Sequence, residues 1–66
     1  MPTLFRKGPY RIFIYASDGN EPMHVHVQRE GRIAKFWIRP VWIAQAGGFT
    51  LIELRAIMRI IRNEQA

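Results

Sequence analysis

The sequence predicts an α+β fold, in which an antiparallel β-meander of three or four strands is packed on one face by a C-terminal α-helix. Two observations support this prediction. Residues 10–44 contain short β-branched and aromatic segments separated by turn formers, as hairpin-connected strands do. Residues 51–63 carry apolar side chains at three- and four-residue spacing, as amphipathic helices do. Because the chain has 66 residues, we expect one small domain over residues 1–66 with one core.

The expected strands are marked by composition and by the turn formers between them. They cover about residues 10–16, 23–28, 32–39 and, at most as an edge strand, 41–44. Asp18-Gly19 between the first two strands is a strong hairpin signal. Pro40 cannot donate a ladder hydrogen bond, which is why residues 41–44 are expected only at an edge. Gly47-Gly48 then ends the sheet.

The helix is predicted from its start signal and from its apolar stripe. Thr50 followed three residues later by Glu53 has the form of a capping box. The apolar stripe that should face the sheet consists of Leu51, Leu54, Ile57, Met58 and Ile61. Arg55, Arg59 and Arg62 follow the same spacing on a neighbouring face, where they form either a solvated stripe or a site for phosphate or a partner.

Alternation along the strands separates a core face from an exposed face. The face expected in the core is almost purely apolar and contains Tyr10, Ile12, Ile14, Ala16, Met23, Val25, Val27, Ala34, Phe36 and Ile38. The opposite face mixes cations with aromatic rings and contains Arg11, Phe13, Tyr15, His24, His26, Gln28, Ile33, Lys35, Trp37 and Arg39. The functional surface is therefore expected on the second face.

Composition and charge limit the classes of function. The chain has no cysteine, which excludes disulfides and thiolate metal sites and favours an intracellular compartment. No apolar stretch is long enough for a signal peptide or a membrane span, so we expect no membrane partner and a cytoplasmic location. Ten Lys and Arg against five Asp and Glu give a formal net charge of +5, which favours an acidic partner.

The exposed face suits two kinds of partner. Aromatic rings offer stacking area to bases while Arg and Lys neutralise phosphates, so single-stranded RNA is one candidate and a small acidic protein is another. The alternative is a homodimer in which two such faces pack together through Phe13, Ile33 and Trp37. The residues expected to bind RNA or a partner are Arg11, Tyr15, His24, His26, Lys35, Trp37 and Arg39.

His24 and His26 are the only histidines, and they project from the same side of their strand. A zinc site needs a third ligand, for which only Asp18 and Glu21 lie nearby, so we expect neither a metal nor another cofactor. The pair could act as general base and general acid in a metal-independent ribonuclease, which makes them the candidate catalytic residues. Binding without catalysis is the favoured interpretation, because no further ligands or substrate pocket are visible.

Several segments also carry a resemblance to a known family. These are Met1-Pro2-Thr3-Leu4, the strand Tyr10–Tyr15, the turn Asp18–Pro22 and the run His24-Val25-His26-Val27. Together, over roughly the first forty residues, they resemble the bacterial family called domain of unknown function 4160. The resemblance implies a small intracellular protein of a toxin–antitoxin-like or regulatory module, and it brings no established catalytic residues. Met23 and Val25 depart from the family, which usually has Pro and Phe there.

Overall fold

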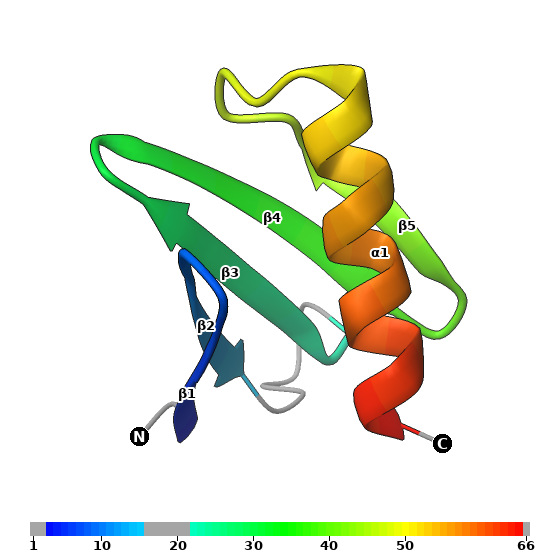
Figure 1. Ribbon diagram of the computed structural model, residues 1–66. Coiled ribbons are helices and arrows are strands. Elements are labelled where there is room, and N and C mark those ends of the chain that lie inside the picture. Colours follow the sequence, from blue (N-terminus) through cyan, green and yellow to red (C-terminus); the bar gives the residue numbers. More distant parts are fainter. Residues whose placement is uncertain (1–2, 16–21, 66) are drawn as a thin grey trace.

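The computed structural model describes residues 3–15 and 22–65, which form a five-stranded antiparallel sheet and one helix (Figure 1). The strands are β1 (Thr3–Lys7), β2 (Tyr10–Tyr15), β3 (His24–Arg29), β4 (Arg32–Ile38) and β5 (Val41–Gln45), and the helix is α1 (Leu51–Gln65). The order in the sheet is β1-β2-β3-β4-β5, so every strand pairs with its neighbour in sequence. The predicted α+β class and antiparallel meander with a C-terminal helix are therefore confirmed.

The predicted number of strands was wrong, because β1 forms a fifth strand at the edge of the sheet. It pairs with β2 in a register that places Leu4 opposite Phe13 and Arg6 opposite Arg11. This strand has only five residues, and its polar end runs directly into the turn at Gly8. So short a segment shows too little alternation to be recognised as a strand from sequence.

The strand and helix ends differ from the expected ones by one or two residues. The second expected strand begins at His24 in the structure, so Met23 precedes it. The fourth expected strand, over residues 41–44, forms as β5 at an edge of the sheet and includes Gln45. The helix continues to Gln65. Ala16 lies outside the described residues. Within the described part of the chain, no helix is long and apolar enough to cross a membrane.

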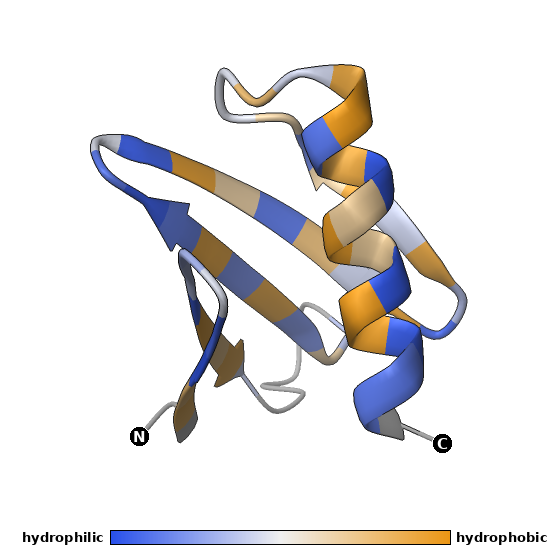
Figure 2. Ribbon diagram, in the orientation of Figure 1, coloured by the Kyte–Doolittle hydropathy of each residue, from blue (hydrophilic) through white to orange (hydrophobic). Residues whose placement is uncertain are grey.

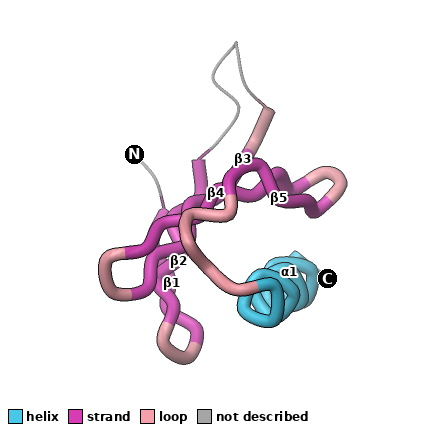
Figure 3. Tube along the Cα trace, turned by 90° about the horizontal axis from the view of Figure 1, so that it is seen from above, coloured by secondary structure: helices cyan, strands magenta, loops and turns pink. Residues whose placement is uncertain are grey.

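The core lies between α1 and one face of the sheet, and the helix covers only that face (Figure 3). Hydrophobic and hydrophilic residues alternate along β3 and along most of β4, as expected for strands with one covered face (Figure 2). Phe36, Ile12, Ile57 and Val27 are the largest fully buried side chains. Each stabilises the fold by about 1.5–3 kcal/mol through removal of its apolar surface from water.

Two residues predicted for the core lie outside it. Met23 is 37% exposed because it precedes β3 and is not held by the ladder. Leu51 is 57% exposed because it is the first residue of α1, before the helix reaches the sheet. Ile14 is partly buried and packs against the core, and the remaining predicted core residues of the described strands and helix are buried.

The connection between β5 and α1 depends on a close backbone approach. Gly47 has a φ of +63°, and a Cβ at this position would lie 1.8 Å from the carbonyl oxygen of Ile33. No other residue type fits there without displacing the backbone of β4. The loop also inserts Phe49 into the core, with its ring centroid 6.2 Å from that of Tyr10.

The predicted capping box forms at the start of α1 and also connects the helix to the β3–β4 hairpin. The Glu53 amide donates to Thr50 Oγ1 at 3.2 Å, and the Thr50 amide donates to Glu53 Oε1 at 3.1 Å. Arg32 Nη1 lies 3.3 Å from Glu53 Oε1, and Arg29 Nη1 lies 3.5 Å from Oε2. The Thr50 amide and the two guanidinium charges, opposed by desolvation, hold the pKa of Glu53 below its ordinary value.

Candidate functional site on the open sheet face

The sheet face turned away from α1, here called the open face, carries its side chains in rows that run across the strands. The register of the sheet defines three such rows. The first contains Tyr15, His24, Trp37 and Trp42; the second contains Leu4, Phe13, His26, Lys35 and Gln45; the third contains Arg6, Arg11, Gln28 and Ile33. An aromatic row therefore lies beside rows that contain the cations.

Tyr15, His24, His26 and Trp37 form one cluster of packed rings. The Tyr15 and His24 rings are stacked, with centroids 5.2 Å apart and an interplanar angle of 4°. The His26 ring lies 4.7 Å from Tyr15 and 5.3 Å from His24. Trp37 meets His24 edge to face at 6.0 Å. The two histidines are thus brought together, as their spacing predicts, within an aromatic cluster.

His24 is the most buried ring of this cluster and is only 5% exposed. Its Nδ1 is 3.0 Å from the carbonyl oxygen of Pro22, so Nδ1 carries the hydrogen that this oxygen accepts. The bond fixes the ring plane against which Tyr15 stacks. His24 therefore positions the other rings, whereas His26 is only half-buried and is the more accessible of the two imidazoles.

Two cations lie over aromatic rings of the open face. Lys35 Nζ is 4.8 Å from the centroid of the Trp37 ring, and Arg11 Cζ is 5.8 Å from that of Phe13. Such contacts contribute about 0.5–1 kcal/mol each at exposed sites. They hold positive charge directly beside the rings, where a base and its phosphate would both meet the protein.

Trp42 extends the aromatic row to the edge strand β5 and is 61% exposed. It lines a hollow of about 330 Å³ together with Pro22, Trp37, Arg39 and Pro40. The sequence predicted Arg39 but missed Trp42, although alternation along residues 41–44 places this ring opposite Trp37 and away from the core. Arg39 follows the end of β4 and is exposed at the rim of the hollow.

The open face is cationic in the described part of the chain. The acidic residues in the described part of the chain lie elsewhere: Glu30 is in the β3–β4 turn, and Glu53 and Glu64 are on α1. Among the same residues, no group of three or more His, Cys, Asp and Glu could hold a metal ion. Asp18 and Glu21, the remaining ligands considered from sequence, lie outside the described residues.

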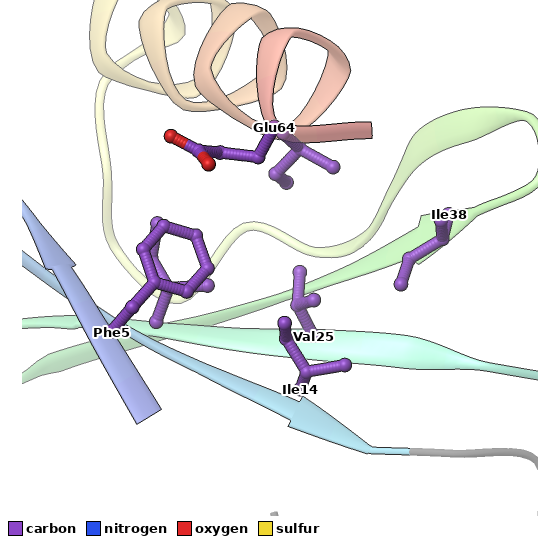
Figure 4. A pocket seen from close by; sticks show the side chains of 7 residues that line it. Phe5, Ile14, Val25, Ile38 and Glu64 are labelled. Carbon is purple, nitrogen blue, oxygen red and sulfur yellow. The ribbon is translucent and has the colours of Figure 1, made fainter. Parts of the chain in front are cut away.

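A second hollow lies on the core side, between the last turns of α1 and the strands (Figure 4). It is lined by Phe5, Ile12, Ile14, Val25, Ile38, Ile61 and Glu64. Its volume is about 80 Å³, well below the 300 Å³ or more that is typical of ligand sites. This hollow is a small packing space next to the core, so the open face is the stronger candidate site.

Comparison with known protein families gives a match over most of the chain. The family model described as domain of unknown function (DUF4160) matches residues 10–66, so the similarity includes the helix, whereas the segment Met1-Pro2-Thr3-Leu4 lies outside the match. No curated protein and no solved structure matches the chain.

Proposed function

Because the chain belongs to the family described as domain of unknown function (DUF4160), whose description assigns no activity, we propose a function from the open face: it binds single-stranded RNA. The observation that carries this proposal is the aromatic row of Tyr15, Trp37 and Trp42, which lies beside the cations Lys35 and Arg11. Sheets that bind RNA use exposed rings for bases and cations for phosphates.

The expected energies require both the rings and the cations. Stacking contributes about 1–3 kcal/mol per base, so Trp37 and Trp42 together would supply about 2–6 kcal/mol. A micromolar complex needs about 8 kcal/mol, so the remainder must come from phosphate contacts. Lys35, Arg11 and Arg39 lie beside the rings and are placed to make them. Affinity should therefore depend on both salt and ring area.

The same geometry favours binding over RNA cleavage. A general acid–base pair needs both imidazoles within reach of the substrate. His24 is almost fully buried and its Nδ1 is occupied by the Pro22 carbonyl, so only His26 can contact RNA directly. We therefore propose binding rather than cleavage. The family resemblance favours an RNA-binding component of a toxin–antitoxin-like or regulatory module, and metal-independent ribonuclease activity stays a third hypothesis.

Homodimerisation through the open face is the second candidate, and a specific observation favours it. Leu4, Ile33 and Trp42 are exposed large hydrophobic residues on this face. Exposed apolar side chains that share a face are typical of protein interfaces. In a homodimer, each copy would cover the exposed apolar side chains of the other. A dimer of this kind would have to open before RNA could reach the rings.

Titration of a labelled single-stranded RNA at several salt concentrations tests the proposal. Affinity should fall linearly with salt on logarithmic axes, and Lys35→Gln should reduce that slope by about one. Trp42→Ala should weaken binding about 5- to 150-fold, the equivalent of one lost stacking contact. Ile52→Ala removes an exposed aliphatic side chain from α1 and serves as the matched control with unchanged affinity.

Sedimentation of the same samples separates the two candidates. RNA binding to a monomer at low salt supports the proposal that the open face binds RNA. Absence of RNA binding at low salt, together with a dimer that persists at high salt and is lost in Trp42→Ala, would replace it with the homodimer.

A further inference from the structure

The exposed side of α1 carries three arginines that the open face does not use. Arg55, Arg59 and Arg62 follow one another at four- and three-residue spacing, so they form one line along the helix. All three are exposed, and the buried residues Leu54, Ile57, Met58 and Ile61 lie on the other side of the helix. They therefore point away from the sheet.

These three arginines form no ion pair among the described residues, in contrast to Arg29 and Arg32, which both pair with Glu53. The acids of the helix do not approach them. Glu53 and Glu64 are eleven residues apart, about three turns, and so share a different flank of α1. Like charges one turn apart destabilise a helix by about 0.2–0.5 kcal/mol per pair, a cost that nothing in the described chain offsets.

The line of arginines continues into two exposed aliphatic residues. Ile52 precedes Arg55 by three residues and Arg59 by seven, which places it in the same line, and it is 80% exposed. Leu51 lies beside it and is also exposed. We call these five residues, Leu51, Ile52, Arg55, Arg59 and Arg62, the arginine stripe.

We infer that the arginine stripe docks an acidic amphipathic helix of a partner protein. Guanidinium groups bind carboxylates through two parallel hydrogen bonds, and arginine is enriched at protein interfaces. Ile52 and Leu51 would anchor an apolar residue of the partner at one end of the stripe. Charge complementarity then places the apolar residues of the partner at the start of α1 and its carboxylates along the three arginines.

Other acidic partners fit the stripe less well. Nucleic acid would neutralise the arginines but would leave Leu51 and Ile52 in water, and the stripe has no ring on which a base could stack. A lipid surface requires an apolar face along the helix, whereas the apolar part here is confined to its first turn. The stripe and the open face lie on opposite sides of the sheet (Figure 3), so the inference stands independently of RNA binding.

A synthetic helical peptide with leucines in one terminal turn and glutamates on the same face of the following turns, compared with a scrambled peptide of the same composition, tests this inference. We expect the ordered peptide to bind more tightly than the scrambled one. The triple variant Arg55→Gln, Arg59→Gln, Arg62→Gln should weaken its binding at least about tenfold at low salt. These glutamines keep the helix propensity, and circular dichroism verifies that the fold is retained.

The matched control removes the same number of charges from the open face, through Arg6→Gln, Arg11→Gln and Lys35→Gln. This control should bind the ordered peptide within about twofold of wild type, apart from the small uniform effect of net charge. Equal binding of ordered and scrambled peptides, or equal losses in both triple variants, would overturn the inference. Duplex RNA that displaces the peptide and fails to bind the stripe variant would assign the stripe to nucleic acid instead.

Discussion

The core face and the open face of the sheet are formed by alternate residues of the same strands, and only the core face is covered by α1. On the core face, Val25 and Phe36 are opposite one another and are buried under α1. One residue away, His24 and Trp37 are opposite one another on the side without a helix. Packing against α1 stabilises only one face of the sheet, so the other face can carry charged side chains and aromatic rings.

The open face nevertheless contains one almost fully buried side chain. His24 is covered by Tyr15 and Trp37, which replace the helix as its neighbours. The ring cluster therefore acts as a small second core that holds the aromatic row in place. This rigidity lowers the entropic cost of binding a ligand on the rings.

The largest difference between the two faces is expected from one substitution on each face, at the adjacent residues Val25 and His24. Val25→Asp buries an unpaired carboxylate, which should cost more than about 4 kcal/mol. A chain of this size is stabilised by about 3–10 kcal/mol, so the variant should be largely unfolded at room temperature. His24→Ala should cost about 1–3 kcal/mol and remain folded, since it removes a ring and leaves no buried charge.

Circular dichroism melts of both variants measure this difference. Loss of structure in His24→Ala together with a normal melt for Val25→Asp would mean that the two faces have been assigned the wrong way round. A comparably low melting temperature for both would instead make the ring cluster as important to the fold as the core.

A second pair of variants compares the two sides of α1. Ile57 is fully buried against the sheet, so Ile57→Ala should cost about 2–5 kcal/mol through lost burial and the cavity it leaves. Ile52→Ala, on the exposed side, should change stability by less than about 0.5 kcal/mol. Urea unfolding of both variants checks this order. A large loss in Ile52→Ala would show that the arginine stripe is already covered, for example by a second copy.

The two faces could be predicted from the sequence because alternation survives wherever β2, β3 and β4 are long enough to show it. Ile12, Val27 and Phe36 are buried, while Arg11, His26 and Lys35 lie on the open face, as the period of two requires. The capping box was recognisable because Thr50 and Glu53 satisfy each other's amides at a fixed spacing.

Other features depend on contacts that the sequence pattern does not contain. The strand β1 is identified by its pairing with β2, because its own five residues carry too little alternation. Leu51 fits the apolar period of α1 but lies before the helix meets the sheet, and Met23 lies before β3 begins. The burial of His24 follows from two neighbouring rings on other strands, a tertiary effect that no single strand reveals.

A smaller effect than that of a core substitution is expected at the start of α1, where the capping box holds the end of the helix that covers the core face. Thr50→Ala removes the hydroxyl that accepts the Glu53 amide and should cost about 0.5–2 kcal/mol, as N-cap substitutions do. The helix should still form, because its apolar stripe continues to pack on the sheet. Thermal melts of the variant and of wild type measure the change. A loss equal to that of Ile57→Ala would mean that the cap contributes as much to holding α1 in place as the burial of Ile57 does.

The same cap predicts how stability responds to acid. The Thr50 amide and the charges of Arg32 and Arg29 lower the pKa of Glu53 in the folded protein below its ordinary value of 4.5. A lowered pKa stabilises the fold above the ordinary value, and this contribution is lost as the pH falls toward the lowered one. Glu53→Gln keeps a side chain that can reach the Thr50 amide but removes the charge, so its stability should vary less with pH in this acidic range. Denaturant unfolding of both proteins from neutral pH to below pH 4 makes the comparison: wild type should lose its advantage over Glu53→Gln as the carboxylate protonates. An advantage that persists at the acidic end would show that the ion pairs with Arg29 and Arg32 do not contribute to holding the helix on the core face.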